Sequence, residues 1–228
     1  SRMNIQLTAP SGVVYSYFLE PDEQAVLPFS EGSGEYLITC YQQVDGNQYA
    51  ALYTETLTVK LQNEFLPFLY PNQYVNFNPA SAAVQKGAEL SAGAADQIGV
   101  VTAIYNYVIN NLTYDTAKAQ SVQSGYLPNV DVVLAQHTGI CFDYAALMTA
   151  MLRSQNIPTK LVVGYTGSLY HAWINVYLDG QGWVDNVIYF DGHDWKLMDP
   201  TFASSGKQSR EIMQYIGNGS NYKAKYSY

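Results

Sequence analysis

The sequence is poor in charged residues, and basic residues are the scarcer kind. Only 13% of the 228 residues are charged, with 11 Lys and Arg against 19 Asp and Glu, for a formal net charge of −8. A surface of this sign repels the phosphates of nucleic acids and anionic lipids, and no basic cluster offsets the repulsion. We therefore expect no nucleic-acid partner.

Long hydrophobic runs are also missing. No stretch approaches the roughly 18 consecutive apolar residues of a membrane-spanning helix, and the first residues lack the basic and then apolar pattern of a signal peptide. We thus expect no membrane span. The 48% of hydrophobic residues nevertheless supply a large buried core, enough for one domain or two small ones.

Cysteine and histidine are scarce as well. Cys40 and Cys141 are too few for a disulfide framework and lack the paired spacing of a zinc site, so we expect neither metal nor cofactor. A disulfide between the two is a minor alternative. His193, with Asp191 and Asp194, could suggest calcium, but the spacing matches no calcium-binding loop, and a solvated turn is the better interpretation.

Residues 1–80 are expected to form a small β-rich region, a sheet or sandwich followed by a connector. Strand patterns occupy residues 13–19 and 35–41, and a hairpin is marked by Asp45-Gly46-Asn47. The next strand has a two-residue period, and the face that we expect to be buried consists of Tyr53, Leu57, Val59 and Leu61. Cys40 is interpreted as an ordinary strand residue.

Residues 81–228 are expected to form a second domain of helices followed by an antiparallel sheet. Four helices are predicted: an Ala-rich one within 80–95, one capped by Asp96, a short one over 131–136, and a nearly all-apolar one from Cys141 to about Gln155. The helix capped by Asp96 has an apolar stripe, which consists of Ile98, Val101, Tyr105, Val108 and Leu112. The predicted strands are 160–165, 171–178, 182 onward, 194–199 and 222–228, with a short helix near 210–216 before the last.

Cys141 lies at the first turn of the apolar helix. There, unpaired backbone N–H groups and the positive end of the helix dipole favour thiolate over thiol. A thiolate nucleophile needs a base within hydrogen-bond reach and a third group that orients the base. His171 opens a strand, and Asp199 ends a later strand of the same meander, so the three can meet at one edge of the sheet. The order Cys, His, Asp predicts a catalytic triad.

The residues around this triad resemble the transglutaminase-like core of the papain-like cysteine enzymes, and its bacterial members in particular. The shared motifs are Gly-Ile-Cys-Phe-Asp-Tyr-Ala at 139–145, Leu-Arg at 152–153 with Ile-Pro at 157–158, His-Ala-Trp at 171–173, Asp-Pro-Thr at 199–201 and the leading Asn-Leu-Thr-Tyr-Asp at 111–115. The resemblance covers about residues 95 to 205. It implies an α+β fold in which a central Cys-bearing helix packs on an antiparallel sheet.

The resemblance also implies a function. Cys141 would be the nucleophile, His171 the general base and acid, and Asp199 the residue that orients the histidine. Such an enzyme acts on protein or peptide amides through a thioester, as a transglutaminase-like acyltransferase or as a hydrolase, either peptidase or amidase. The alternative is a non-catalytic or latent cell-surface binding module on the same fold, which would use the β-rich region and the 21 tyrosines.

Few lysines, many tyrosines and an extra β-rich region are typical of secreted or surface-attached bacterial relatives. We therefore expect an extracellular or cell-surface location. Family members stabilise the oxyanion with the backbone N–H of the nucleophile and with an upstream side chain. For that side chain we favour Tyr114 over its rivals Gln136 and Tyr126. Trp173 shares a strand face with His171, so it can shield the imidazole or line the acyl site.

Two residues near Cys141 have competing interpretations. His137 could be mistaken for the base, but a residue in the preceding loop need not face the thiol. Asp143 can cap the start of the helix or interact with His171. The cap is preferred because carboxylates suit the first turn of a helix.

Overall fold

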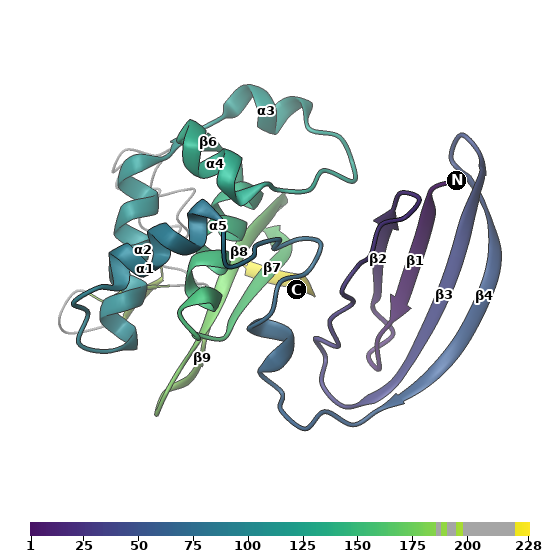
Figure 1. Ribbon diagram of the computed structural model, residues 1–228, viewed down its shortest axis with the longest axis horizontal. Helices are drawn as coiled ribbons and strands as arrows, with labels where there is room; N and C mark the ends of the chain where they lie inside the picture. The colour runs from purple at the N-terminus through teal and green to yellow at the C-terminus, as the bar shows by residue number, and fades with distance from the viewer. Residues whose placement is uncertain (186–187, 191–194, 198–221) are drawn as a thin grey trace. The chain divides into compact units, whose positions relative to one another are not determined.

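The computed structural model describes residues 1–185, 188–190, 195–197 and 222–228 (Figure 1). The chain forms two compact units, Ser1–Pro67 and Phe68–Tyr228, which divide within the 3-10 turn η1 (Leu66–Phe68). The predicted domain division at residue 80 remains a prediction. In the described part of the chain, no helix is long and apolar enough to cross a membrane.

The first unit is one antiparallel sheet rather than a sandwich, with the strand order β2-β1-β3-β4. Its strands are β1 (Met3–Thr8), β2 (Val14–Leu19), β3 (Gly34–Asp45) and β4 (Gln48–Val59). The hairpin between β3 and β4 turns at Gly46, whose φ of 49° lies in the left-handed region that a tight turn requires. Cys40 is an ordinary residue of β3, as predicted, and its thiol is free.

The prediction of a buried face on β4 is wrong. Tyr53 is 53% exposed, and Leu57, Val59 and Leu61 are only half-buried. β4 is an edge strand that pairs with β3 alone, and the buried side chains of this unit gather on β1, β2 and the first part of β3. The alternation in β4 therefore marks a strand but not a covered face.

The second unit begins with helices. They are α1 (Ala82–Ser91), α2 (Gln97–Asn111), α3 (Thr116–Ser121) and α4 (Val130–Gln136), and the two-residue strands β5 (Thr113–Tyr114) and β6 (Thr138–Gly139) lie among them. Asp96 caps α2 as predicted, because its carboxylate accepts a hydrogen bond of 2.8 Å from the N–H of Gly99. The predicted apolar stripe of α2 is buried at Val101, Tyr105, Val108 and Leu112. α3 was not predicted.

The central element of this unit is α5 (Cys141–Ser154), which contacts α1, α2 and α4 as well as the sheet (Figure 1). Every residue from Asp143 to Arg153 is buried. α1 crosses α5 closely at Gly87, where an added Cβ would lie 3.2 Å from the backbone of Met151. The nearly all-apolar sequence of α5 thus reflects burial on all sides, and the predicted central helix is confirmed.

The main sheet is antiparallel and has the order β12-β7-β8-β9, and α5 packs on β7 and β8. Its strands are β7 (Thr159–Thr166), β8 (Leu169–Leu178), β9 (Gly182–Val184) and β12 (Tyr222–Ser227). β10 (Ile188–Phe190) and β11 (Trp195–Leu197) instead form a separate two-stranded sheet. The prediction that β11 continues the meander of His171 is therefore wrong. The predicted helix near 210–216 lies outside the described residues.

Arg153, near the end of α5, holds three segments together through backbone carbonyl groups. Its guanidinium donates to the carbonyl oxygens of Thr159 at 2.9 Å, Tyr70 at 2.7 Å and Tyr228 at 2.7 Å. The side chain is 3% exposed. Burial lowers the pKa of Arg153 to about 9, which still leaves the guanidinium charged at neutral pH. One planar donor set thus joins the start of β7, the end of β12 and the connector before α1.

We expect Arg153→Met to lower the free energy of unfolding by about 3 kcal/mol, because three carbonyl groups lose their donor. All three tryptophans, Trp173, Trp183 and Trp195, lie in this unit, so urea unfolding followed by tryptophan fluorescence reports its stability. The matched control is Lys225→Met, which removes an exposed cation of β12 and should change the stability by less than about 1 kcal/mol. Equal losses in the two variants would contradict the assigned role of Arg153.

Candidate active site

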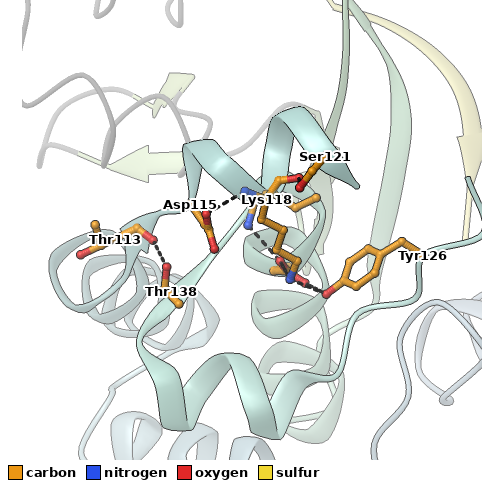
Figure 2. Close-up of polar contacts among 8 residues, drawn as sticks. Thr113, Asp115, Lys118, Ser121, Tyr126 and Thr138 are labelled. Carbon is orange, nitrogen blue, oxygen red and sulfur yellow. Dashed lines mark hydrogen bonds and ion pairs between the residues drawn. The ribbon is translucent and has the colours of Figure 1, made fainter. Parts of the chain in front are cut away.

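Two short parallel strands place two helix starts side by side. β5 pairs with β6, with Thr113 opposite Thr138 and Tyr114 opposite Gly139. The N–H of Asp115 donates to the carbonyl of Gly139 at 2.9 Å, and the hydroxyl of Thr138 donates to the carbonyl of Thr113 at 3.1 Å (Figure 2). Because β5 leads into α3 and β6 leads into α5, the starts of these helices are neighbours.

Cys141 is the first residue of α5, as predicted, and its thiol is free and half-buried. Ile140 precedes it as the N-cap residue. Asp143, the third residue of α5, accepts a hydrogen bond of 2.9 Å from the N–H of Ile140. This is the preferred interpretation of Asp143, a carboxylate that caps the helix start. The nucleophile candidate thus lies in a first turn whose backbone is fixed by a side chain of the same turn.

The carboxylate of Asp143 has two further partners, which come from outside α5. The Nζ of Lys118 in α3 lies 2.7 Å from Oδ2 of Asp143, and the hydroxyl of Tyr126 donates to Oδ1 at 2.5 Å. Lys118 also donates to the Tyr126 hydroxyl oxygen at 2.7 Å (Figure 2). These residues form a closed network, called here the Asp143 network: Lys118, Tyr126, Asp143 and the N–H of Ile140.

The electrostatics of the Asp143 network follow from burial. Asp143 is fully buried, and its side chain has no solvent contact, whereas 30% of the Lys118 side chain is exposed. Desolvation alone would lower the pKa of Lys118, but the hydrogen bonds to Asp143 and Tyr126 outweigh it and raise that pKa. Desolvation, with the hydrogen bond to Asp143, also raises the pKa of Tyr126. Lys118 is therefore a cation and Tyr126 a neutral donor at neutral pH.

Gly139 is required by the close packing of this network. A Cβ at this position would lie 2.6 Å from the Cβ of Asp143, well inside van der Waals contact. A backbone-attached atom of Asp143 cannot swing away without moving the start of α5. The glycine before the nucleophile therefore allows β6 to approach the capping carboxylate.

His171 and Trp173 lie on β8, against which α5 packs. His171 is 3% exposed and stands opposite Gly164 of β7. An added Cβ at Gly164 would lie 2.9 Å from the Trp173 ring, so the indole occupies the side-chain space across from His171. Trp173 is itself 2% exposed and contacts Tyr222 of β12 edge to face. This arrangement is consistent with a ring that shields the imidazole.

The candidates for the side-chain oxyanion donor occupy different environments. Tyr114 is half-buried and pairs in register with Gly139, the residue two positions before Cys141. The hydroxyl of its rival Tyr126 already donates to Asp143. The other rival, Gln136, is exposed at the end of α4. Tyr114 therefore remains the predicted donor.

The remaining predicted residues lie away from the nucleophile or outside the described part. His137 ends α4 with a left-handed φ of 53°, and its side chain is exposed. Asp199, the predicted orienting residue, lies outside the described residues, as do Asp191, His193 and Asp194. Among residues 1–185, 188–190, 195–197 and 222–228, no three His, Cys, Asp or Glu side chains are grouped to hold a metal ion.

Sequence reasoning missed Lys118. The signal that could have found it is compositional, because Lys118 is the one lysine or arginine between Lys86 and Arg153. A carboxylate in the first turn of an otherwise apolar helix must be buried with that helix, and a buried carboxylate needs a cation or several donors. The first lysine or arginine upstream of that helix is Lys118.

A protein-family model matches the part of the chain that carries this site. Residues 84–186 match the family model of the transglutaminase-like superfamily, a range that includes Cys141 and His171. The chain thus contains a transglutaminase-like domain, and the resemblance seen in the motifs is confirmed. The fold of this domain is of the mixed α+β class, as the resemblance implied.

Individual relatives are distant. The chain is 25% identical to the uncharacterized protein YebA of Bacillus subtilis over 183 residues, 71% of this chain and 25% of YebA. It is 28% identical to human kyphoscoliosis peptidase over 116 residues, 46% of this chain and 15% of the peptidase. The chain therefore spans a quarter or less of these relatives. The periplasmic domain of TgpA from Pseudomonas aeruginosa is a solved structure with 17% identity, a TM-score of 0.46, and coverage of 94% of this chain and 91% of that one.

We expect Gly139→Ala to lower the free energy of unfolding by about 2 kcal/mol, because the new methyl group collides with Asp143 and loosens the start of α5. The control is Gly99→Ala, where the nearest atom to the added Cβ is 3.3 Å away and the change should stay below about 1 kcal/mol. Urea unfolding followed by tryptophan fluorescence measures both. A Gly139→Ala protein as stable as the wild type would show that the contact is easily relieved.

Proposed function

We propose that the chain is a cysteine-dependent enzyme that acts on protein or peptide amides through a thioester on Cys141. The observation that supports this most directly is the position of a free, half-buried thiol at the first residue of α5, where the helix dipole favours thiolate. The packing of α5 on β8, the strand of His171, adds to it. The transglutaminase-like domain supplies the class of enzyme.

In the proposed reaction the thiolate of Cys141 attacks the carbonyl carbon of the amide, and the carbonyl π electrons move onto oxygen. The imidazolium of His171 gives its proton to the departing nitrogen as the C–N bond breaks, which leaves a thioester and releases ammonia or an amine. Water or a second amine then attacks the thioester while His171 takes its proton. The C–S bond breaks and the thiolate returns.

Three other residues have proposed roles. Asp199 would accept the second ring N–H of His171 and hold the imidazole in the tautomer that the reaction needs. The backbone N–H of Cys141 and the hydroxyl of Tyr114 would stabilise the oxyanion, and one such donor lowers the barrier by roughly 3 kcal/mol. Trp173, whose ring lies across from His171, would shield one side of the imidazole or line the acyl site.

Hydrolysis is at least as favoured as cross-linking, because water always competes for the thioester. An extracellular or cell-surface location is part of the same proposal and rests on the β-rich first unit and the tyrosine-rich composition.

A binding function is the second candidate. It is favoured by one observation, the exposure of the large apolar side chains of Val44, Leu52 and Tyr53 on the hairpin of β3 and β4. A protein that only binds would keep its function in a Cys141→Ala variant.

We expect Cys141 to react with iodoacetamide at neutral pH at least about tenfold faster than Cys40, since a helix start favours thiolate and a strand does not. Cys40 is also free and half-buried, so it serves as the reference thiol within the same molecule. Mass spectrometry of the two cysteine peptides after short labelling gives both rates. Equal rates would sink the claim of an activated nucleophile.

We expect the wild type to release ammonia from a glutamine-containing protein or to cleave its peptide bonds, and Cys141→Ala to lose this activity by at least about 10³-fold. Ammonia release is measured with and without an added primary amine to separate acyl transfer from hydrolysis. Incorporation of the amine into the substrate marks acyl transfer, and ammonia release without incorporation marks hydrolysis. Cys40→Ala is the matched control and should leave the activity unchanged. Full activity in Cys141→Ala would exclude the proposed chemistry.

A further inference from the structure

Lys118 lies next to the start of α5, but the proposed reaction gives it no role. It is the third residue of α3, and Asp143 is the third residue of α5. Because Tyr114 is in register with Gly139, the two helices start at equivalent positions and their third residues face each other. The ion pair of 2.7 Å between Lys118 and Asp143 is thus a product of the parallel β5 and β6 pair.

The carboxylate of Asp143 has two opposite effects on the thiol. It holds the first turn of α5 by accepting the N–H of Ile140 at 2.9 Å. It is also a buried negative charge two residues from the half-buried Cys141, where it disfavours a second negative charge on sulfur. Lys118 supplies the compensating positive charge, so the geometry of the cap is kept while the charge on it is balanced.

The other charged groups around α5 have partners of their own. Within the described residues of the elements that pack against α5, these groups are Lys86 and Glu89 of α1, which pair at 2.6 Å, Asp131 of α4, which accepts the N–H of Ala83 at 2.9 Å, and Lys160 of β7, which lies over the rings of Phe68 and Trp183. In addition, Arg153 of α5 is bound to carbonyl groups, Asp115 before α3 accepts the backbone N–H of Lys118 at 2.8 Å, and His171 of β8 is the proposed base. The charge of Asp143 is therefore balanced by Lys118.

Tyr126 closes the arrangement. Its hydroxyl donates to Asp143 and accepts from Lys118, and the Lys118 Nζ lies 4.4 Å from the centre of its ring. The tyrosine adds no charge at neutral pH, so it fixes the lysine in place over the carboxylate without changing the balance.

We propose that Lys118 is a positioning residue for the reaction, which neutralises the capping carboxylate of Asp143 and thereby preserves the thiolate of Cys141. This inference rests on the proposed function of Cys141, but it concerns the origin of thiol reactivity and not the substrate. The side-chain contacts of Lys118 in this network are with Asp143 and Tyr126. Its effect is carried by the charge of Asp143 and by the first turn of α5.

The test is the pH dependence of iodoacetamide labelling at Cys141, with Cys40 as the internal reference. Lys118→Met removes the cation and keeps the length of the side chain. It should slow labelling at pH 7 by about three- to tenfold and move the profile to higher pH, because an uncompensated carboxylate disfavours thiolate. Lys118→Arg keeps the charge and should stay within about threefold of the wild type. Lys86→Met, which breaks an exposed ion pair on α1, is the control and should change nothing.

A double variant separates charge from structure. In Lys118→Met combined with Asp143→Asn, the amide oxygen still accepts the N–H of Ile140, but both charges are gone. Labelling should return to within about twofold of the wild type if Lys118 acts by charge compensation. A folded double variant that stays as slow as Lys118→Met would overturn the proposal, as would an unchanged rate in Lys118→Met.

If Lys118→Met does not fold, Asp143→Asn alone decides the question. It leaves the cation uncompensated and should label at least as fast as the wild type at pH 7, whereas a purely structural network predicts slower labelling. Different measurements would show that the proposed function fails: a wild-type Cys141 that reacts no faster than Cys40, or a Cys141→Ala protein that keeps its activity. The two failures are therefore distinguishable.

Discussion

The burial of one carboxylate, that of Asp143, is the constraint on which the candidate active site depends. An unpaired charge without solvent costs several kcal/mol, so the fold must bring donors to it. The donors come from three segments: the N–H of Ile140 before α5, Lys118 in α3 and Tyr126 in the loop between α3 and α4. Satisfying one group thus fixes the relative positions of the segments that surround Cys141.

The apolar remainder of α5 makes this constraint effective. From Tyr144 onward the helix is buried among α1, α2, α4 and the sheet, so it cannot slide or rotate to relieve strain at its first turn. Arg153 holds the other end through three carbonyl groups. A nucleophile at the first residue of such a helix is held at one end by polar contacts and along its length by packing.

Local patterns in the sequence were sufficient for much of this structure. The cap at Asp96, the stripe of α2 from Val101 onward and the start of α5 at Cys141 depend on neighbours within a few residues, and all three are confirmed. The exposed face of β4 and the ion pair of Lys118 depend on which segment lies opposite. Alternation in a strand does not predict whether a second layer covers one of its faces, and a lysine in a segment without a clear pattern does not predict its partner. The triad itself depends on contacts of the same long-range kind.

The main sheet joins segments that are far apart in the chain. β12, formed by residues 222–228, pairs with β7, while β8 pairs with the other side of β7. During synthesis, β7 and β8 are complete while β12 is still to be made, and β7 is then an open sheet edge with unpaired backbone groups. The main sheet therefore cannot finish folding until β12 has left the ribosome. Until then β7, which pairs with the His171 strand β8 on one side, has no strand on its other side.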